Sequence, residues 1–275
     1  MIENPMKRIY SKRGKNSHKF NFGHLLVIGG SKKYSGSPAF ASLAAYRTGV
    51  DLVTTMAPRR AADIIATFSP DLITVPLKGD YFEEKHIKEV EKIKNFSAVV
   101  IGGGLERKKE TFRAVNKFLK KLNKPCVIDA DAIHAISKNK KIIKNKLFVL
   151  TPHLHEFKVL TGTDVKGLDL NEKKKIVERS ANKIGCIILL KGNPDIISDG
   201  HLTKINKTGN PYMTVGGTGD VLAGVIGSLL SQGATPFDAA MTGAYMTGKV
   251  GDLVAKTKKE SMTASDLIDN FYKIF

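Results

Sequence analysis

The stretch TVGGTGDVLAGVIG, residues 214–227, is the part of the sequence that decides the fold. Gly216, Gly217 and Gly219 precede an apolar run of helical length, and Asp220 stands in the first turn of that expected helix. Glycines there let backbone N–H groups crowd together and face an anion at the helix N-terminus. Asp220 is therefore either a helix cap, worth about 1 kcal/mol, or a general base beside a bound phosphate. The stretch is not a Walker loop, because no Gly-Lys-Ser/Thr follows, and its position near the C-terminal end argues against a dinucleotide fingerprint.

Upstream of this stretch, short apolar runs alternate with segments of helical spacing. The runs predict strands at His24–Ile28, Leu52–Met56, Leu72–Val75, Ala98–Ile101, Val127–Asp129, Phe148–Thr151 and Ile187–Leu190. Helices are expected at Ser37–Thr48, Arg60–Phe68, Glu83–Lys94, Glu110–Leu122, Asn171–Ile184, Gly219–Ser231, Pro236–Val250 and Ala264–Tyr272. Runs rich in Val, Ile and Leu are typical of parallel strands buried on both faces, so we expect an α/β fold with a mostly parallel central sheet and helices on both faces. A hairpin of Asp195–Ser198 and His201–Ile205 is expected at one edge.

Polar or glycine-rich residues follow five of the expected strands. They are Gly29–Ser31 with Tyr34–Pro38, Gly102–Gly104, Asp129–Ala132, Thr151–Glu156 and Lys191–Asn193. The carboxyl ends of parallel strands lie along one edge of the sheet, where ligands bind in such folds. These segments therefore predict one shared cleft. Two alternatives stay open here: His153 is a ligand contact or a helix cap, and Asp129 and Asp131 bind Mg²⁺ or substrate or cap a helix that begins at Ala132.

The composition limits the class of protein. The chain has 275 residues, 42% of them apolar, and a formal net charge of +18. Its 36 Lys outnumber its 8 Arg, and no aromatic residues are interleaved with the Lys clusters, which favours a solvated lysine surface over a nucleic-acid interface. The sequence holds no apolar run long enough for a membrane span, and Cys126 and Cys186 read as reduced core residues of a cytoplasmic protein. We expect one domain over residues 20–275, with residues 1–19 as an N-terminal extension.

The glycine-rich stretch resembles the anion hole and catalytic Asp of ribokinase-like small-molecule kinases. Four of the strand-end motifs, all except Gly102–Gly104, narrow the resemblance to one branch, the ADP-dependent NAD(P)H-hydrate dehydratases, which form the C-terminal half of many bifunctional NAD(P)H-hydrate repair enzymes. The resemblance runs from about His18 to the C-terminus and keeps the order of the motifs. It implies a ribokinase-like fold with a small edge hairpin.

The resemblance also implies a repair reaction on (6S)-hydrated NADH and NADPH. A phosphoryl group passes from ADP or ATP to the hydroxyl of the hydrate, and phosphate then leaves to restore the double bond. Mg²⁺ is expected to bridge the nucleotide phosphates. Within the same fold, the alternative is a kinase of a small alcohol such as a thiazole, a pyrimidine or a sugar. A basic nucleic-acid-binding protein without catalysis is the alternative from another class.

The family's functional residues map onto matching positions of this sequence. Asp220 matches the catalytic base, which also contacts the substrate. Ser37, Gly104 and His153 match the other substrate contacts, while nucleotide contacts are matched by Lys191, Gly192, Asn193, Pro194, Asp195, Gly217, Thr218 and Gly219. The family commonly has Ala where Ser37 stands and Thr where Asp195 stands, and a carboxylate there would repel phosphate unless it faces away. The resemblance identifies no metal ligands.

The resemblance further implies a homotetramer, for which the Ala-rich segment Ser37–Val50 is a candidate interface. The bifunctional relatives carry an epimerase domain before the dehydratase, and about 19 residues cannot encode one, so this chain is expected to perform only the dehydratase half, with a separate epimerase as a candidate partner. We also expect part of the positive charge to attract the two anionic ligands.

Overall fold

Nine strands form one mixed sheet in the part of the chain that the structure describes, residues 5–10 and 13–275 of a computed structural model. The strand order is β3-β2-β1-β4-β5-β6-β7-β8-β9, and β1 to β7 are parallel while β8 and β9 are antiparallel to their neighbours. The strands are β1 His24–Ile28, β2 Leu52–Pro58, β3 Ile73–Leu77, β4 Ala98–Ile101, β5 Cys126–Ile128, β6 Phe148–Leu150, β7 Ile187–Leu190, β8 Asp195–Ser198 and β9 Thr203–Asn206. The order reverses between β1 and β4, and such a switch point opens a crevice for ligands at the carboxyl ends of the strands.

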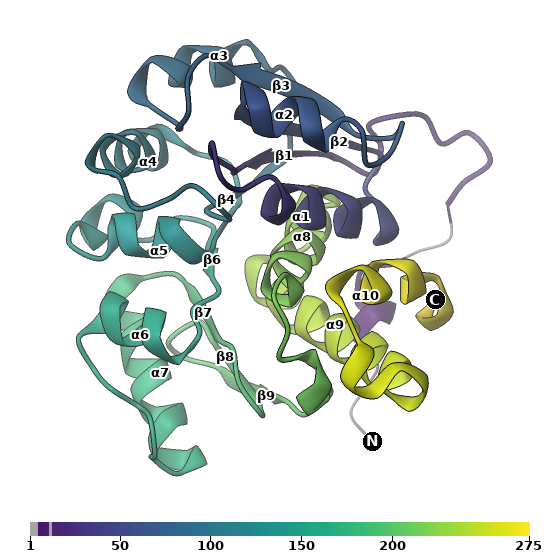
Figure 1. Cartoon of the computed structure of the whole chain (residues 1–275). Helices are drawn as coiled ribbons and strands as arrows, with labels where there is room; N and C mark the ends of the chain where they lie inside the picture. The colour runs from purple at the N-terminus through teal and green to yellow at the C-terminus, as the bar shows by residue number, and fades with distance from the viewer. Residues whose placement is uncertain (1–4, 11–12) are drawn as a thin grey trace.

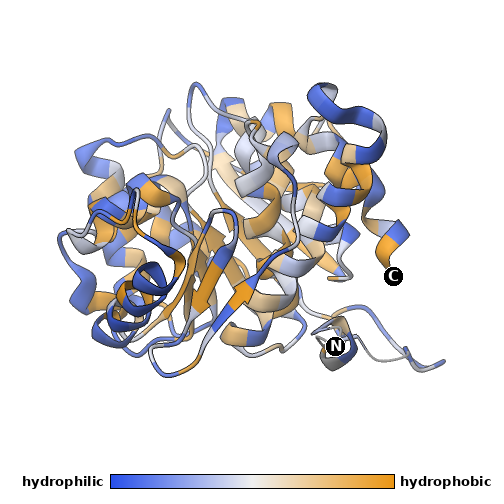
Figure 2. Ribbon diagram, turned by 90° about the horizontal axis from the view of Figure 1, so that it is seen from below, coloured by the Kyte–Doolittle hydropathy of each residue, from blue (hydrophilic) through white to orange (hydrophobic). Residues whose placement is uncertain are grey.

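Helices cover both faces of the sheet (Figure 1). On one face lie α3 Ile87–Lys92, α4 Lys109–Lys121, α5 Ala130–Ile136, α6 Leu154–Thr161 and α7 Leu170–Ile184. On the other lie α1 Gly36–Arg47, α8 Thr218–Ser231, α9 Pro236–Lys258 and α10 Ala264–Asn270, with α2 Arg59–Ile65 beside α1. Strand residues alternate between the two cores: Leu26 and Ile28 pack on the first face, and Leu25 and Val27 on the second. The central strands β1 and β4 to β7 are accordingly mostly apolar (Figure 2), whereas the edge strand β9 carries polar residues.

The predicted fold class is confirmed, with several differences in the elements. Two helices, α5 and α6, are absent from the set of helices expected from the sequence pattern. They are only 7 and 8 residues long and begin inside the polar strand-end motifs. The expected helix over residues 83–94 is a 3₁₀ turn, Glu84–His86, followed by the shorter α3. The helix expected at Pro236–Val250 continues to Lys258. Short amphipathic patterns carry little periodicity, so tertiary packing sets these boundaries.

The Ala-rich helix α1 is buried within the protomer. Its alanines pack against α8, and a Cβ added at Gly224 of α8 would lie only 2.1 Å from the Ala41 carbonyl oxygen. Helices approach this closely only where small residues meet. The alanines of α1 therefore do not form the exposed subunit interface for which the sequence made them a candidate.

The N-terminal segment also packs on the body of the protein. Met6, in the 3₁₀ turn Pro5–Arg8, is buried, and the Tyr10 hydroxyl donates to the Thr48 carbonyl oxygen at 2.8 Å. Residues 1–4 and 11–12 of the predicted extension lie outside the described residues. A search of the described helices finds none whose length and apolar character would let it cross a membrane.

Candidate active site

The N-terminus of α8 forms one wall of the site, and the glycine-rich stretch shapes it. Gly217 has a φ of 98°, which favours glycine, and a Cβ there would lie 2.7 Å from the Phe40 ring. The Thr218 hydroxyl donates to the carbonyl oxygens of Met213 (3.0 Å) and Val215 (3.1 Å) and so fixes the loop before the helix. Gly219 continues the wall, and Lys191 Nζ lies 3.3 Å from the position a Cβ would occupy there. A helix N-terminus beside an ammonium group is suited to binding phosphate.

Asp220, in the first turn of α8, is the predicted base. The Ser37 side chain lies beside it, and both residues border the same small void. A Cβ added at Gly103 would lie 2.6 Å from Asp220 Oδ1 and 2.9 Å from Ser37 Cβ, so only glycine fits there. Burial, followed by the negative charge of Asp129, raises the pKa of Asp220 to about 7, against the lowering effects of Ser37 and Lys191. A carboxylate with a pKa near neutrality is suited to general base catalysis.

Lys191 forms ion pairs with two carboxylates other than that of Asp220. Its Nζ donates to Asp129 Oδ1 at 2.9 Å and lies 3.9 Å from Glu156 Oε2. Burial alone would lower the pKa of Lys191, but the charges of Asp129 and Glu156 outweigh it and raise the pKa. Burial raises the pKa of Glu156, and Thr151 Oγ1 donates a second hydrogen bond to Asp129 Oδ1 at 2.8 Å. The negative charges of Asp129 and Glu156 thus add to burial in opposing the ionisation of Asp220.

His153 lies at the N-cap of α6. Its Nδ1 accepts from the backbone N–H groups of His155 (3.1 Å) and Glu156 (3.3 Å), and Glu156 Oε2 accepts from the His153 N–H at 2.9 Å. The ring also lines the main cavity, with half of the side chain exposed. The two interpretations of His153 are therefore compatible, because one nitrogen caps the helix and the other remains open to a ligand.

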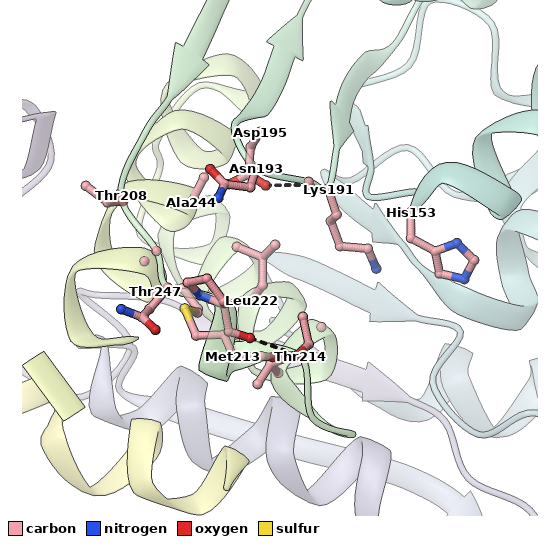
Figure 3. Close-up of a pocket in the computed structure, with 17 residues that line it drawn as sticks. His153, Lys191, Asn193, Asp195, Thr208, Met213, Thr214, Leu222, Ala244 and Thr247 are labelled. Atoms are coloured by element: carbon pink, nitrogen blue, oxygen red, sulfur yellow. Dashed lines mark hydrogen bonds between the residues drawn. The ribbon is translucent and has the colours of Figure 1, made fainter. Parts of the chain in front are cut away.

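The main cavity, about 510 Å³, extends from His153 and Lys191 to α8 and α9. Met213, Leu222 and Ala244 give it an apolar side, whereas Lys191 and Asn193 lie on the opposite side (Figure 3). Its full lining is His153, Lys191, Gly192, Asn193, Asp195, Thr208, Gly209, Asn210, Pro211, Met213, Thr214, Thr218, Gly219, Leu222, Ala244, Thr247 and Gly248. An apolar slot that opens onto a helix N-terminus has room for a base and its phosphates.

Asp195 does not aim an unpaired carboxylate at this cavity. Its Oδ1 accepts from the Gly192 N–H at 2.9 Å, and its Oδ2 accepts from Asn206 Nδ2 at 3.0 Å. The carboxylate therefore shapes the loop from Lys191 to Asp195 and ties it to β9. Repulsion of phosphate by this group, the concern that the sequence raised, is reduced by these two hydrogen bonds.

Most of the residues predicted for the site come together at the carboxyl edge of the sheet. Gly104 does not reach Asp220: a Cβ there would meet Tyr34, and it is the neighbouring Gly103 that abuts the carboxylate. The sequence left Asp129 open between a ligand contact and a helix cap and did not assign Glu156, whereas in the structure Asp129 pairs with Lys191. Sequence reasoning missed several cavity residues from the last two long helices and the loop before them, namely Thr208, Met213, Leu222, Ala244 and Thr247. Their apolar or small side chains resemble those of any buried helix, so only the tertiary structure identifies them.

The described residues do not form a protein cage for a metal ion. They contain no group of three or more His, Cys, Asp or Glu side chains arranged to hold one. Asp129 is paired with Lys191, and Asp131 accepts from the Glu106 N–H at 2.9 Å and from Arg107 Nε at 3.0 Å. Asp129 stands at the N-cap of α5 without a side-chain capping bond, so its side chain serves Lys191 and not the helix.

The chain has the fold of solved ribokinase-like structures, and its site places a carboxylate in the first turn of a helix whose N-terminus is suited to binding phosphate. The model of the NAD(P)H-hydrate dehydratase family matches residues 25–273, and the chain belongs to this family. Family membership favours the dehydratase over the kinase of a small alcohol.

Three relatives illustrate the similarity. The chain is 40% identical over 265 residues to a bifunctional NAD(P)H-hydrate repair enzyme of Pyrobaculum aerophilum, covering 95% of this chain and 52% of the relative. It is 36% identical to the ADP-dependent (S)-NAD(P)H-hydrate dehydratase of Nitrosopumilus maritimus, covering 96% and 92% of the two chains. The solved ADP/ATP-dependent NAD(P)H-hydrate dehydratase of Bacillus subtilis, co-crystallised with ATP/Mg²⁺, shares the fold, with a TM-score of 0.79, 24% identity and coverage of 98% and 95%. The chain thus spans about half the length of its bifunctional relatives and nearly all of the single-function one.

Proposed function

We propose that this chain dehydrates (6S)-hydrated NADH and NADPH to NADH and NADPH, using ADP or ATP as phosphoryl donor. The observation that carries the proposal is the position of Asp220. Its carboxylate lies one residue beyond Gly219 at the N-terminus of α8, with a pKa raised to about 7. A base next to a phosphate-binding helix end can deprotonate a hydroxyl group that attacks a phosphoryl group.

In the proposed reaction, Asp220 takes the proton of the hydrate hydroxyl. The hydroxyl oxygen forms a bond to the terminal phosphorus of the nucleotide, and the bond to the bridging oxygen breaks, releasing AMP or ADP. The C–O bond to the new phosphate group then breaks, phosphate leaves, and loss of a ring proton restores the double bond. Hydroxide is a poor leaving group and phosphate a good one, which is why a phosphoryl donor is required.

The two ligands approach the base from different sides in this proposal. The nucleotide occupies the main cavity, with its phosphates at Gly217, Thr218 and Gly219 and its base beside the apolar side chains of α8 and α9. Lys191 and the loop up to Asp195 form the facing wall. The hydrate lies toward Ser37, Gly104 and His153, where Ser37 and Gly103 border a small void next to Asp220. Binding from two sides brings the hydroxyl and the phosphorus together, and such positioning supplies much of the rate enhancement.

We propose that Mg²⁺ arrives with the nucleotide, because the described side chains do not provide a cage for it. Mg²⁺ neutralises charge on bound phosphates when it is present, and it commonly keeps several waters and few protein ligands. The solved relative with ATP/Mg²⁺ supports this part of the proposal. Lys191 remains the protein's own cation at the phosphates, and its hydrogen bond to Asp129 holds it in place.

Three further parts of the proposal concern the protein as a whole. Both cysteines are free and buried, which supports a reducing, cytoplasmic location. We propose a homotetramer, to be tested by light scattering, and supply of the S epimer by an epimerase, whether a separate protein or another domain. The domain boundaries at residues 20–275 likewise remain a proposal, for which limited proteolysis is the test.

A coupled assay tests the activity. Purified protein is incubated with hydrated NADH or NADPH, Mg²⁺ and either ADP or ATP, and the return of dihydronicotinamide absorbance is followed together with phosphate release. We expect one phosphate per restored cofactor, and AMP as the second product with ADP. Phosphorylation of a thiazole, a pyrimidine or a sugar without any recovery of the cofactor would point to the kinase instead.

A further inference from the structure

A second cavity, of about 300 Å³, lies at the C-terminal ends of α6 and α7, beside the 3₁₀ turn Lys140–Ile143. These helices cover the face of the sheet opposite α8 and α9 (Figure 1). The site around Asp220 is at their N-terminal ends, and the 15 residues of α7 correspond to about 22 Å of helix. The lining residues of the second cavity are Lys140, Thr161, Thr163, Ile176, Arg179, Ser180, Lys183 and Ile184.

Three cations line this cavity, and their charge exceeds what the two helix ends can balance. They are Lys140, Arg179 and Lys183, and none of the described residues of the lining is acidic. Each helix C-terminus carries the equivalent of about half a negative charge, so the two ends together offset about one cation and leave about two positive charges. This excess is available to an anionic ligand.

The carboxylates that adjoin the lining in the sequence are engaged elsewhere. Asp164 accepts a hydrogen bond from Lys158 Nζ at 2.8 Å. Glu178 accepts one from the Thr203 hydroxyl of β9 at 2.7 Å. Neither carboxylate therefore pairs with the cations of the cavity.

Most of the polar side chains around the cavity have open hydrogen-bonding positions. Four of them form no hydrogen bond or ion pair with another described residue: Thr163, Arg179, Ser180 and Lys183. Lys140 Nζ donates to the Ser137 carbonyl oxygen at 2.8 Å and keeps two further donors. Ile176 and Ile184 add apolar surface to the same cavity.

We propose that this cavity is a second anion site, which takes a small phosphate-bearing molecule. Guanidinium and ammonium groups bind phosphate oxygens through charge-assisted hydrogen bonds, which are stronger than neutral ones. The hydroxyl groups of Thr163 and Ser180 supply further donors, and the two isoleucines can contact an apolar part of the ligand. The site is separate from the reaction at Asp220, and the proposal does not rest on the proposed function.

Two double variants of α7 test the site with inorganic pyrophosphate as the probe, followed by calorimetry in 0.1 M KCl. Arg179→Gln with Lys183→Gln removes two cations of the cavity. Lys174→Gln with Lys175→Gln removes two cations of the same helix that do not line it and is the matched control. The main cavity is intact in all the proteins, so a difference between them reports on the second cavity.

We expect the control to bind pyrophosphate as the wild type does. The cavity variant should lose one equivalent of probe or bind it at that site at least about 10-fold more weakly. Equal Tm values in the two double variants would show that the fold is retained. A comparison of phenyl phosphate with inorganic phosphate then identifies the ligand class, because tighter binding of phenyl phosphate indicates an organic phosphate and the reverse indicates the free ion.

Two results would overturn the proposal. One is unchanged stoichiometry and affinity for pyrophosphate in the cavity variant. The other is an equal loss in the control, which would show diffuse attraction by the lysine surface and no defined site. If the protein does not convert the hydrate, the proposed function fails, while the binding data still decide whether the second site exists.

Discussion

Asp220 combines two properties that normally exclude each other, burial and a role that needs charge. Desolvation and the neighbouring Asp129 raise its pKa to about 7, and the Ser37 side chain and Lys191 partly compensate. The balance keeps the carboxylate half-ionised near neutral pH, where a base is both available and strong enough to act. Predictions at the scale of single residues therefore concern Asp220 and Lys191.

Asp220→Asn should reduce kcat by a factor of about 10² to 10⁴, because the amide keeps the shape of the side chain and cannot accept the hydroxyl proton. Nucleotide affinity, measured by calorimetry, should change little, since the backbone of residues 217–219 holds the phosphates. Asp63→Asn, an exposed site on α2, is the control. Normal turnover in Asp220→Asn would leave Asp220 only a structural role.

The pH dependence of kcat/KM should follow Asp220. Activity is expected to rise as pH increases through about 7, because the base works only when it is ionised. Lys191→Met removes a positive charge that lowers the pKa of Asp220, so the midpoint of this limb should move to higher pH. A limb that stays in place in Lys191→Met would mean that another group titrates.

Stability should depend on pH through the same carboxyl group. The pKa of Asp220 in the folded state, about 7, lies above its ordinary value of 3.8, so the folded state holds the proton more tightly, and the stability from this group falls as pH rises from 3.8 through about 7. Asp220→Asn removes this loss of stability at high pH, because the amide does not ionise. We expect the variant to gain in Tm over the wild type at pH 8 and to gain little at pH 4, as measured by calorimetry.

At the scale of elements, the turn after β4 can pack against the first turn of α8 only because residue 103 is glycine. A Cβ at Gly103 would lie 2.6 Å from Asp220 Oδ1, a distance at which one of the two segments must move. The close packing of the Asp220 carboxylate thus requires glycine at position 103. The capping box of α6 likewise fixes part of the site, because its hydrogen bonds hold His153 and Glu156 in one turn.

Gly103→Ala should lower kcat at least about 10-fold, since a displacement of about 1 Å of a reacting group has large effects on rate. The overall fold should persist, as judged by circular dichroism. Gly36→Ala is the matched control, because a Cβ there meets nothing closer than 3.8 Å and the residue begins a helix in the same region. Equal losses in both variants would indicate a general disturbance of the turns.

At the scale of the whole molecule, the net charge of +18 is spread over a lysine-rich surface, while the site itself is acidic in balance. Asp129, Glu156 and Asp220 face the single ammonium of Lys191. Attraction of anionic ligands must therefore come from the surface as a whole and not from the residues next to the base. Such long-range attraction is screened over about 10 Å at 0.1 M salt.

Raising the ionic strength should lower kcat/KM for the anionic hydrate and leave kcat nearly unchanged, because screening slows encounter and does not alter the bound state. Steady-state rates in KCl from about 0.02 to 0.3 M measure this, a range over which the Debye length falls severalfold. Potassium chloride and potassium glutamate should act alike. Independence of kcat/KM from salt would show that the lysine surface plays no part in binding.

Much of the fold and part of the site could be predicted from the sequence. Buried parallel strands need continuous Val, Ile and Leu runs, and a helix end suited to phosphate needs closely spaced glycines, so both leave local patterns. The short helices α5 and α6 leave little helical periodicity, because they are only 7 and 8 residues long.

The sequence by itself determined the apolar runs that form the buried strands and the glycine-rich start of α8, and it predicted Asp220 as the candidate base. Only the tertiary structure decided that Gly103 and not Gly104 supports this carboxylate, that Asp195 shapes a loop, and that Asp129 and Glu156 share Lys191. These are contacts between residues far apart in the chain. Their geometry depends on which strands are neighbours and on how closely α1 and α8 pack, and no local pattern of residues encodes that.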